Sequence, residues 1–177
     1  EHGTLPELSE TRVAFNELSL TGRPTEKEVR DAIGRVVDSG WFILGPEVEA
    51  FESELARAVG SRHAVGVASG TDAITLALMA SGVVAGDEVV TTPLTAAFTA
   101  LAISRIGASP VFADVEEATL LLSPSNAAAR MTERSRALVP VHLYGNACPI
   151  DILSELAEER GLALVEDACQ AHGGTFR

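Results

Sequence analysis

The sequence predicts an α/β fold, a three-layer domain in which a mostly parallel sheet carries helices on both faces. Two observations support this prediction. From residue 62 onward, short apolar runs alternate with segments whose apolar residues recur at helical spacing. Strands that alternate with helices are typical of parallel strands joined by right-handed crossovers. The apolar runs are also nearly continuous, as expected for strands that are covered on both faces.

Two helices are expected before the alternating region. The first begins at Thr25, which forms a capping-box pattern with Glu28, and it ends at Gly40. A short apolar connector, "WFILGP", follows it. The second helix begins at Pro46, a residue suited to the first helical position, and it ends at Gly60. We expect residues 1–24, which are polar and aperiodic, to form an N-terminal arm. The α/β domain is then expected to occupy residues 25–177.

The alternating region then supplies the sheet and its covering helices. Strands are expected over residues 63–69, 87–93, 109–115, 136–145 and 162–167. Helices are expected over residues 71–82, 95–107, 124–132 and 149–161. In open α/β sheets ligands bind beyond the carboxyl ends of the strands, so the residues at those ends are the candidates for function.

Composition excludes several classes of function. The chain has 177 residues, 46% of them apolar, and a net charge of −12. Such an acidic chain offers no basic stripe for nucleic acid or for an anionic membrane surface. Its two cysteines, Cys148 and Cys169, form no disulfide framework, and a cytoplasmic location is the simplest expectation. No signal-peptide pattern and no run of membrane-spanning length is found, so we expect no membrane partner.

The stretch "VASGTDA" is a candidate phosphate site. A strand, a tight turn at Gly70 and a helix start follow one another, and a helix N-terminus offers unpaired N–H groups and a positive dipole end. Thr71 adds a hydroxyl. An equally good interpretation is a simple helix cap by Ser69 or Thr71. The dinucleotide fingerprint G-x-G-x-x-G is absent, and Ser69 has no motif of a nucleophile.

Asp167 is the second candidate, because it ends the apolar run "LALVED". A buried carboxylate without a partner is costly. An opposite charge about 4 Å away attracts it by roughly 4 kcal/mol at an effective dielectric near 20. A protonated pyridine nitrogen, as in pyridoxal phosphate enzymes, is one possible partner. A salt bridge to an arginine such as Arg105, or capping of the next turn, is the alternative.

A metal site is not expected. Cys169 and His172 make an incomplete zinc set, and Cys148 lies in no supporting motif. Lys27 is the only lysine, and it lies beside Glu26 and Glu28 at a helix start. We expect it to be a solvated surface charge, not a desolvated catalytic amine.

Motifs along nearly the whole chain resemble those of the DegT-type sugar aminotransferases, which are fold type I pyridoxal phosphate enzymes. These motifs are "SGWFILGPEVEAFESELARAVG", "VASGTDAITLAL", "GDEVVTTP", "GASPVFADV", "ALVPVHLYG" and "LVEDACQAHGG", in this order. The resemblance covers roughly residues 13–177. It implies that the chain is the incomplete large domain of such an enzyme.

The resemblance also implies roles for matching residues. Gly70 and Thr71 would hold the cofactor phosphate, Asp167 would pair with the pyridine nitrogen, and Gln170 would hydrogen-bond the hydroxyl side of the ring. His172 lies in the same loop. The aromatic residue that stacks on the cofactor in the family aligns with Ala97, so the adjacent Phe98 is the candidate.

The family's Schiff-base lysine would lie beyond Arg177, so no catalytic residue is expected in this chain, and the chain alone should be inactive. The implied activity is transfer of an amino group from glutamate or glutamine to a nucleotide-linked keto-sugar or a related cyclic ketone, in antibiotic or polysaccharide biosynthesis, by a homodimer. A sugar dehydratase of the same fold, and a non-catalytic α/β binding module, are the alternatives.

Overall fold

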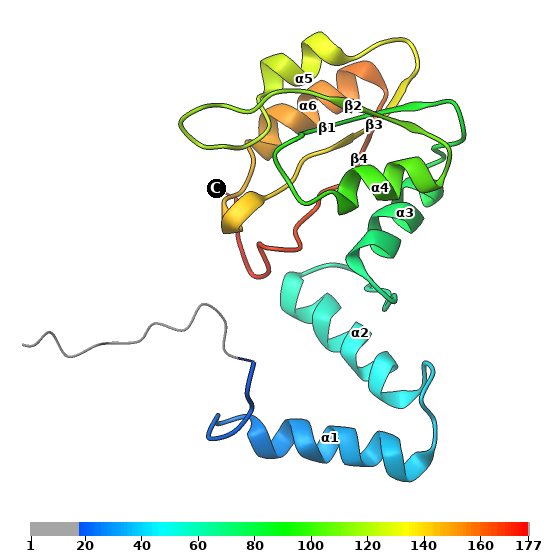
Figure 1. Cartoon of the computed structure of the whole chain (residues 1–177), viewed down its shortest axis with the longest axis vertical. Coiled ribbons are helices and arrows are strands. Elements are labelled where there is room, and N and C mark those ends of the chain that lie inside the picture. The colour runs from blue at the N-terminus through cyan, green and yellow to red at the C-terminus, as the bar shows by residue number, and fades with distance from the viewer. Residues whose placement is uncertain (1–17, 177) are drawn as a thin grey trace, which may run out of the picture. The chain divides into compact units, whose positions relative to one another are not determined.

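The computed structural model describes residues 18–176 (Figure 1). These residues belong to two compact units, which divide between Phe51 and Glu52. The predicted arm over residues 1–24 lies mostly outside the described residues. The elements in chain order are α1 (Glu26–Ser39), α2 (Pro46–Val59), α3 (Gly70–Ala80), β1 (Glu88–Thr91), α4 (Phe98–Arg105), β2 (Ser109–Phe112), α5 (Pro124–Arg130), β3 (Ser135–Val139), the 3-10 turn η1 (Leu143–Gly145), α6 (Ile150–Arg160) and β4 (Ala163–Leu164).

Helix α1 begins where the sequence predicts it, but the predicted capping box does not form. Thr25 is the N-cap residue, and its side chain accepts no hydrogen bond from the helix. Its backbone, at φ −88° and ψ 1°, does not have the extended conformation that directs an N-cap side chain toward the helix amides. The carboxylate of Glu26 accepts a hydrogen bond from the N–H of Gly22 instead, at 2.8 Å.

The sheet has four strands in the order β2-β1-β3-β4, and every pair is parallel. Strands β1 and β3 lie at its centre. An isolated parallel bridge between Val141 and Asp167 continues the pairing of β3 with β4 beyond the last regular ladder residues. This bridge places Asp167 at the carboxyl edge of the sheet, beside the chain that leaves β3.

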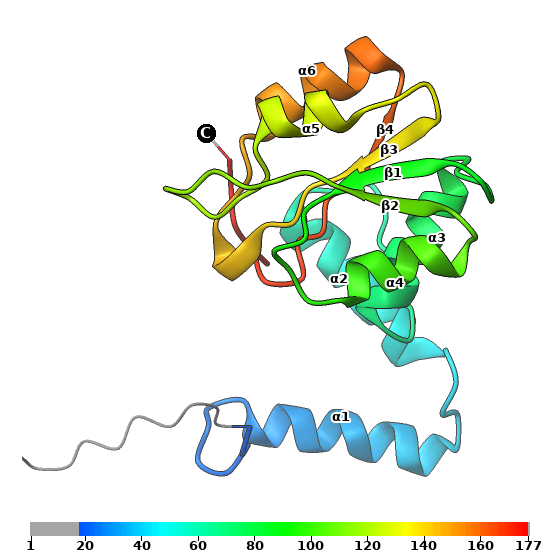
Figure 2. The same ribbon diagram turned by 45° about the horizontal axis from the view of Figure 1, so that its top comes forward.

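Helices cover both faces of the sheet, as predicted. Figures 1 and 2 show α3 and α4 on one face and α5 and α6 on the other. One apolar core lies under α3 and α4, where Leu78 and Ile103 pack with Val89 of β1. The second lies under α5 and α6, where Leu153 packs with Val90 and Leu138. Adjacent residues Val89 and Val90 serve opposite cores because successive side chains of a strand point to opposite faces.

The strand predicted over residues 63–69 is wrong. No residue of this segment pairs with a strand of the described sheet. The N–H of Gly66 in this segment donates instead to the carboxylate of Glu52 at 2.6 Å. The apolar pattern that suggested a strand remains exposed, with Val65 at 77%. A strand forms only where a neighbouring strand accepts its backbone hydrogen bonds, and an apolar run in the sequence does not supply that neighbour.

Among the described helices, none combines the length and apolar character needed to cross a membrane.

Candidate active site

The candidate site begins at the N-terminus of α3. Ser69 is the N-cap residue: its hydroxyl accepts a hydrogen bond from the N–H of Asp72 at 3.1 Å and donates to the carboxylate of Asp72 at 2.8 Å. The capping interpretation is therefore correct for Ser69. The next two amides, those of Gly70 and Thr71, have no acceptor within residues 18–176. Unpaired amides at a helix N-terminus form a binding site for an anion.

Gly70 lies directly against the loop that carries Asp167. A Cβ atom at position 70 would meet the sulfur of Cys169 at 3.1 Å. Real Cβ atoms rarely come so close, so with a larger residue at position 70 the side chain of Cys169 would have to move by a few tenths of an ångström. The two segments that the sequence singled out, residues 69–71 and 167–170, therefore adjoin at the same edge of the sheet.

Asp167 is buried, with 7% of its surface exposed. Its carboxylate accepts hydrogen bonds from the hydroxyl of Thr99 at 2.9 Å and from the N–H of Cys169 at 3.3 Å. The pKa of the Cys169 thiol is raised above its ordinary value, first by its hydrogen bond to Asp167 and then by burial. All of these donors are neutral. No arginine, lysine or histidine forms an ion pair with Asp167 in the described part of the chain.

The predicted alternative for Asp167, a salt bridge to Arg105, is wrong. Arg105 instead donates to the carboxylate of Asp72 at 2.7 Å. Asp72 also accepts the hydroxyl hydrogen of Ser69, and these two hydrogen bonds lower the pKa of its carboxyl group. The buried charge of Asp167 is thus left for another partner.

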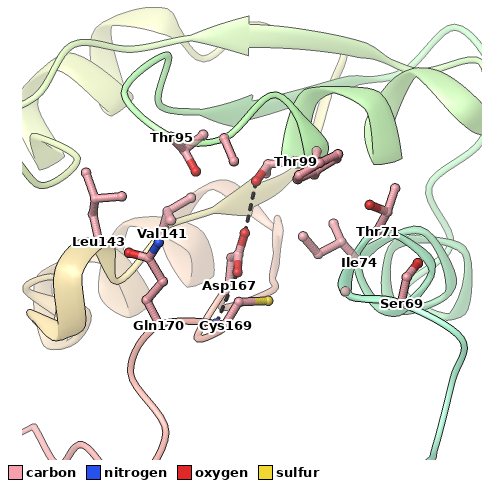
Figure 3. A pocket seen from close by; sticks show the side chains of 13 residues that line it. Ser69, Thr71, Ile74, Thr95, Thr99, Val141, Leu143, Asp167, Cys169 and Gln170 are labelled. Atoms are coloured by element: carbon pink, nitrogen blue, oxygen red, sulfur yellow. Dashed lines mark hydrogen bonds between the residues drawn. The ribbon is translucent and has the colours of Figure 1, made fainter. Parts of the chain in front are cut away.

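Both segments line one cavity of about 310 Å³. Four segments contribute to its wall: the start of α3, the chain between β1 and α4 together with the first turn of α4, the chain after β3, and the loop after β4. Figure 3 shows Asp167 at the centre of this wall, with Thr71 and Ser69 on one side and Gln170 and Val141 on the other. The lining is mainly apolar, and the carboxylate and the helix amides are its charged and strongly polar parts. Cavities of a few hundred cubic ångströms with a few convergent polar groups are typical of small-molecule sites.

The other predicted site residues differ in their placement. Gln170 lines the cavity, and its side-chain oxygen accepts a hydrogen bond from the N–H of Tyr144 at 2.8 Å. Phe98, at the start of α4, also lines the cavity. His172 is exposed and is not part of the cavity wall. Its role stays a prediction.

Glu166 and Asp167 point to opposite sides, as adjacent residues at a strand end do. Glu166 contacts the ring of His142, whose Nε2 lies 2.9 Å from the carboxylate. The Nδ1 atom of the same ring accepts the N–H of Cys148 at 3.0 Å, so Nε2 carries the hydrogen and donates it to Glu166. Glu166 and His142 border a separate depression that excludes Asp167. Within residues 18–176, no cluster of histidine, cysteine and acidic side chains could hold a metal ion.

Lys27 lies on the surface, as predicted. Its side chain is 86% exposed and pairs with Asp31 one turn along α1 at 2.5 Å. It has neither the burial nor the neighbours of a catalytic amine.

Thr99 and Thr95 are cavity residues that the sequence did not single out. Thr99 lies inside a helix, 68 positions before the carboxylate that it contacts, and no local pattern marks such a pair. The available signal was position alone: both threonines follow the carboxyl end of β1, where a ligand site of a parallel sheet is expected.

Comparison with known proteins shows to which family the chain belongs. A model of the DegT/DnrJ/EryC1/StrS aminotransferase family matches residues 24–177. A dTDP-3-amino-3,4,6-trideoxy-alpha-D-glucose transaminase of Streptomyces venezuelae is 46% identical over 166 residues, which are 94% of this chain and 44% of that protein.

Two solved structures extend the comparison. DesV of S. venezuelae, in complex with a ketimine intermediate, aligns with a TM-score of 0.82 and 48% identity, over 84% of this chain and 40% of that one. NtdA of Bacillus subtilis, with bound cofactor PMP, aligns with a TM-score of 0.84 and 30% identity, over 88% and 36%. The chain therefore spans less than half the length of these relatives. It belongs to the DegT/DnrJ/EryC1/StrS aminotransferase family.

Proposed function

We propose that this chain forms the cofactor-binding part of a pyridoxal phosphate-dependent aminotransferase, which moves an amino group from glutamate or glutamine to a nucleotide-linked keto-sugar or a related cyclic ketone. One observation carries the proposal. The carboxylate of Asp167, which is buried and has no cationic partner within residues 18–176, lines the same cavity as the free amides at the start of α3. Pyridoxal phosphate is a ligand with a protonatable ring nitrogen at one end and a phosphate at the other.

The residues of the cavity fit that ligand. The amides of Gly70 and Thr71 would hold the phosphate, because hydrogen-bond donors and the positive end of the helix dipole meet there. Asp72, in the same helix turn, carries a negative charge that would oppose a phosphate. Its contact with Arg105 offsets part of that charge. At the other end, a protonated ring nitrogen would supply the positive charge that offsets the cost of burying the carboxylate of Asp167.

Bound in this cavity, the cofactor would supply an electron sink for chemistry at the amino-bearing carbon. The residues of this chain would orient it and control its protons. Asp167 would hold a proton on the ring nitrogen throughout both halves of the transfer. Gln170 has its side-chain oxygen engaged by Tyr144, so the side-chain nitrogen is left to donate to a ligand oxygen. Phe98 and the apolar lining would exclude water from the ring.

The substrate class rests on the relatives. The S. venezuelae protein that shares 46% identity is named a dTDP-3-amino-3,4,6-trideoxy-alpha-D-glucose transaminase. We extend to this chain only the broader class, a nucleotide-linked keto-sugar. The Schiff-base lysine of the family would come from sequence outside residues 1–177, since Lys27 is a surface residue.

We further propose that the enzyme works as a cytoplasmic homodimer. The connector between α1 and α2 exposes Trp41, Phe42 and Ile43, which is unusual for contiguous large apolar side chains. Sedimentation of the protein expressed from its complete reading frame tests this part: a monomer at micromolar concentration would rule it out.

The activity is tested with the same full-length protein. After incubation with pyridoxal phosphate it should bind the cofactor in a one-to-one ratio. Addition of glutamate or glutamine should then release the matching 2-oxo acid. A nucleotide-linked keto-sugar that is added next should accept the amino group and become an amino sugar. A product that has lost a hydroxyl group without gaining nitrogen would instead establish the dehydratase. Failure to bind the cofactor would favour the non-catalytic module and end the proposal.

A further inference from the structure

We propose that Thr99 is a positioning residue: its hydroxyl fixes the carboxylate of Asp167 so that the carboxylate meets the ring nitrogen of a pyridine ligand. This inference rests on the proposed function, because it concerns the same cavity. It adds a residue from a different element, helix α4, to the site that the strand ends build.

The main chain of Asp167 is already held by the sheet. Its N–H donates to the carbonyl of Pro140 at 2.9 Å, and its carbonyl accepts the N–H of His142 at 3.0 Å. These two bonds fix where the side chain begins. They leave free the rotation of the carboxylate itself, which decides what its oxygens face.

The hydroxyl of Thr99 removes that freedom. It donates to one carboxylate oxygen of Asp167 at 2.9 Å, whereas the N–H of Cys169 lies 3.3 Å from the other oxygen. Thr99 is only 1% exposed, so water does not compete for this bond. As a β-branched residue in a helix, it also has few rotamers, so the direction of its hydroxyl is itself restricted.

The chemistry of the donor supports a positioning role. A lysine or arginine at this place would orient Asp167 but would also neutralise it. A hydroxyl orients the carboxylate and leaves its full negative charge in place. That combination suits a site in which a cationic ligand supplies the opposite charge. Thr99 does not need to touch the ligand to have this effect.

A purely structural role is the competing explanation. A buried hydroxyl needs an acceptor, and Asp167 could be no more than that acceptor. The two roles differ in one measurable respect. A structural contact affects the binding of every ligand of the cavity alike, whereas a positioning contact affects only ligands that use the carboxylate.

The experiment compares two ligands that differ at one ring atom. They are pyridoxamine phosphate and its carbocyclic analogue, in which C–H replaces the ring nitrogen. Binding is measured by calorimetry on the cofactor-free protein from the complete reading frame. Three variants are compared with the wild type: Thr99→Val removes the donor with little change in shape, Thr99→Ser keeps it, and Asp167→Asn removes the charge.

We expect Thr99→Val to bind pyridoxamine phosphate about tenfold more weakly, the loss typical of one hydrogen bond to a charged group. Binding of the carbocyclic analogue should be unchanged. Thr99→Ser should restore the wild-type preference for the ring nitrogen. In the Asp167→Asn background, Thr99→Val should no longer alter that preference, since Thr99 acts through the carboxylate.

Equal weakening of both ligands in Thr99→Val would show a structural role and overturn the inference. So would unchanged affinities. If Thr99→Val does not fold, Thr99→Cys, which replaces the hydroxyl with a much weaker donor and lacks the γ-methyl group, takes its place under the same criteria. A wild-type protein that binds both ligands equally would refute the contact between Asp167 and the ring, which belongs to the proposed function. Discrimination in the wild type that survives Thr99→Val would refute only the role of Thr99.

Discussion

Replacement of Asp167 by asparagine should separate fold from function. The change removes one charge and keeps the shape of the side chain. Thr99 and the N–H of Cys169 contact different oxygens of the carboxylate. In asparagine the amide oxygen can accept the N–H of Cys169, and the amide NH2 can donate to the hydroxyl of Thr99, which can also act as an acceptor. Because the buried carboxylate has no cationic partner within residues 18–176, its removal breaks no ion pair. Without ligand, the variant should be as stable as the wild type, or more stable.

The loss in ligand binding should be large. Opposite unit charges about 4 Å apart attract by about 4 kcal/mol at an effective dielectric of 20, which corresponds to nearly three orders of magnitude in affinity. Asparagine can keep a neutral hydrogen bond worth about 1 kcal/mol. The net expectation for Asp167→Asn is a loss of about two orders of magnitude in the affinity for pyridoxamine phosphate.

Thermal unfolding with and without pyridoxamine phosphate measures both effects. At a ligand concentration of about 100 times the wild-type dissociation constant, the wild type should gain about 2.7 kcal/mol. The variant, with affinity about a hundredfold lower, should gain only about 0.4 kcal/mol at that concentration. Equal ligand-induced stabilisation of the two proteins would refute the reasoning. A variant that is several degrees less stable without ligand would refute the claim that the charge is unpaired.

Three further predictions concern the surroundings of this carboxylate. Gly70→Ala should weaken the binding of inorganic phosphate about tenfold, since its Cβ would meet the sulfur of Cys169 at 3.1 Å; Gly34→Ala, which has open space, is the control. Asp72→Asn should lower the free energy of unfolding at pH 7 but not at pH 2, as measured by chemical denaturation at each pH. Because the pKa of Asp72 is lowered in the fold, its carboxylate stabilises the protein at pH values above the ordinary pKa of 3.8, and this stabilisation is lost as the pH falls. At pH 8, iodoacetamide should alkylate Cys169 more slowly than a free thiol because its pKa is raised, and Asp167→Asn should accelerate the reaction.

Each of these expectations has a contradicting result. Unchanged phosphate affinity in Gly70→Ala would place the anion elsewhere. A stability difference for Asp72→Asn that persists at pH 2 would mean that the side chain acts through packing and not through its charge. Alkylation of Cys169 at the rate of a free thiol would mean that Asp167 does not influence it.

The sequence predicts most of the fold because the signals for helices are local. The bounds of α2 agree with prediction. Pro46 suits the first position of a helix, and Gly60 adopts the positive φ that ends one. The segment 63–69 shows where local signals fail. Its apolar pattern is that of a strand, but strand formation depends on a neighbour that a local pattern cannot provide.

The candidate site divides in the same way. Asp167 could be predicted, because it lies at the end of a strand that pairs within the parallel sheet. Gly70 and Thr71 could be predicted from the start of helix α3, although the strand expected before them does not form. Thr99 could not, because its importance comes from a contact across the fold. The ion pair between Arg105 and Asp72 could not be predicted from the sequence either. Which of two acids an arginine reaches depends on how α3 and α4 pack, and the sequence does not state that.

A crystal structure of the protein from the complete reading frame, grown with pyridoxamine phosphate, would decide whether this cavity is a cofactor site. We expect the phosphate at the amides of Gly70 and Thr71, and the ring nitrogen within hydrogen-bonding distance of the carboxylate of Asp167. Electron density with the phosphate away from α3, or with the ring nitrogen turned from Asp167, would contradict the proposed function.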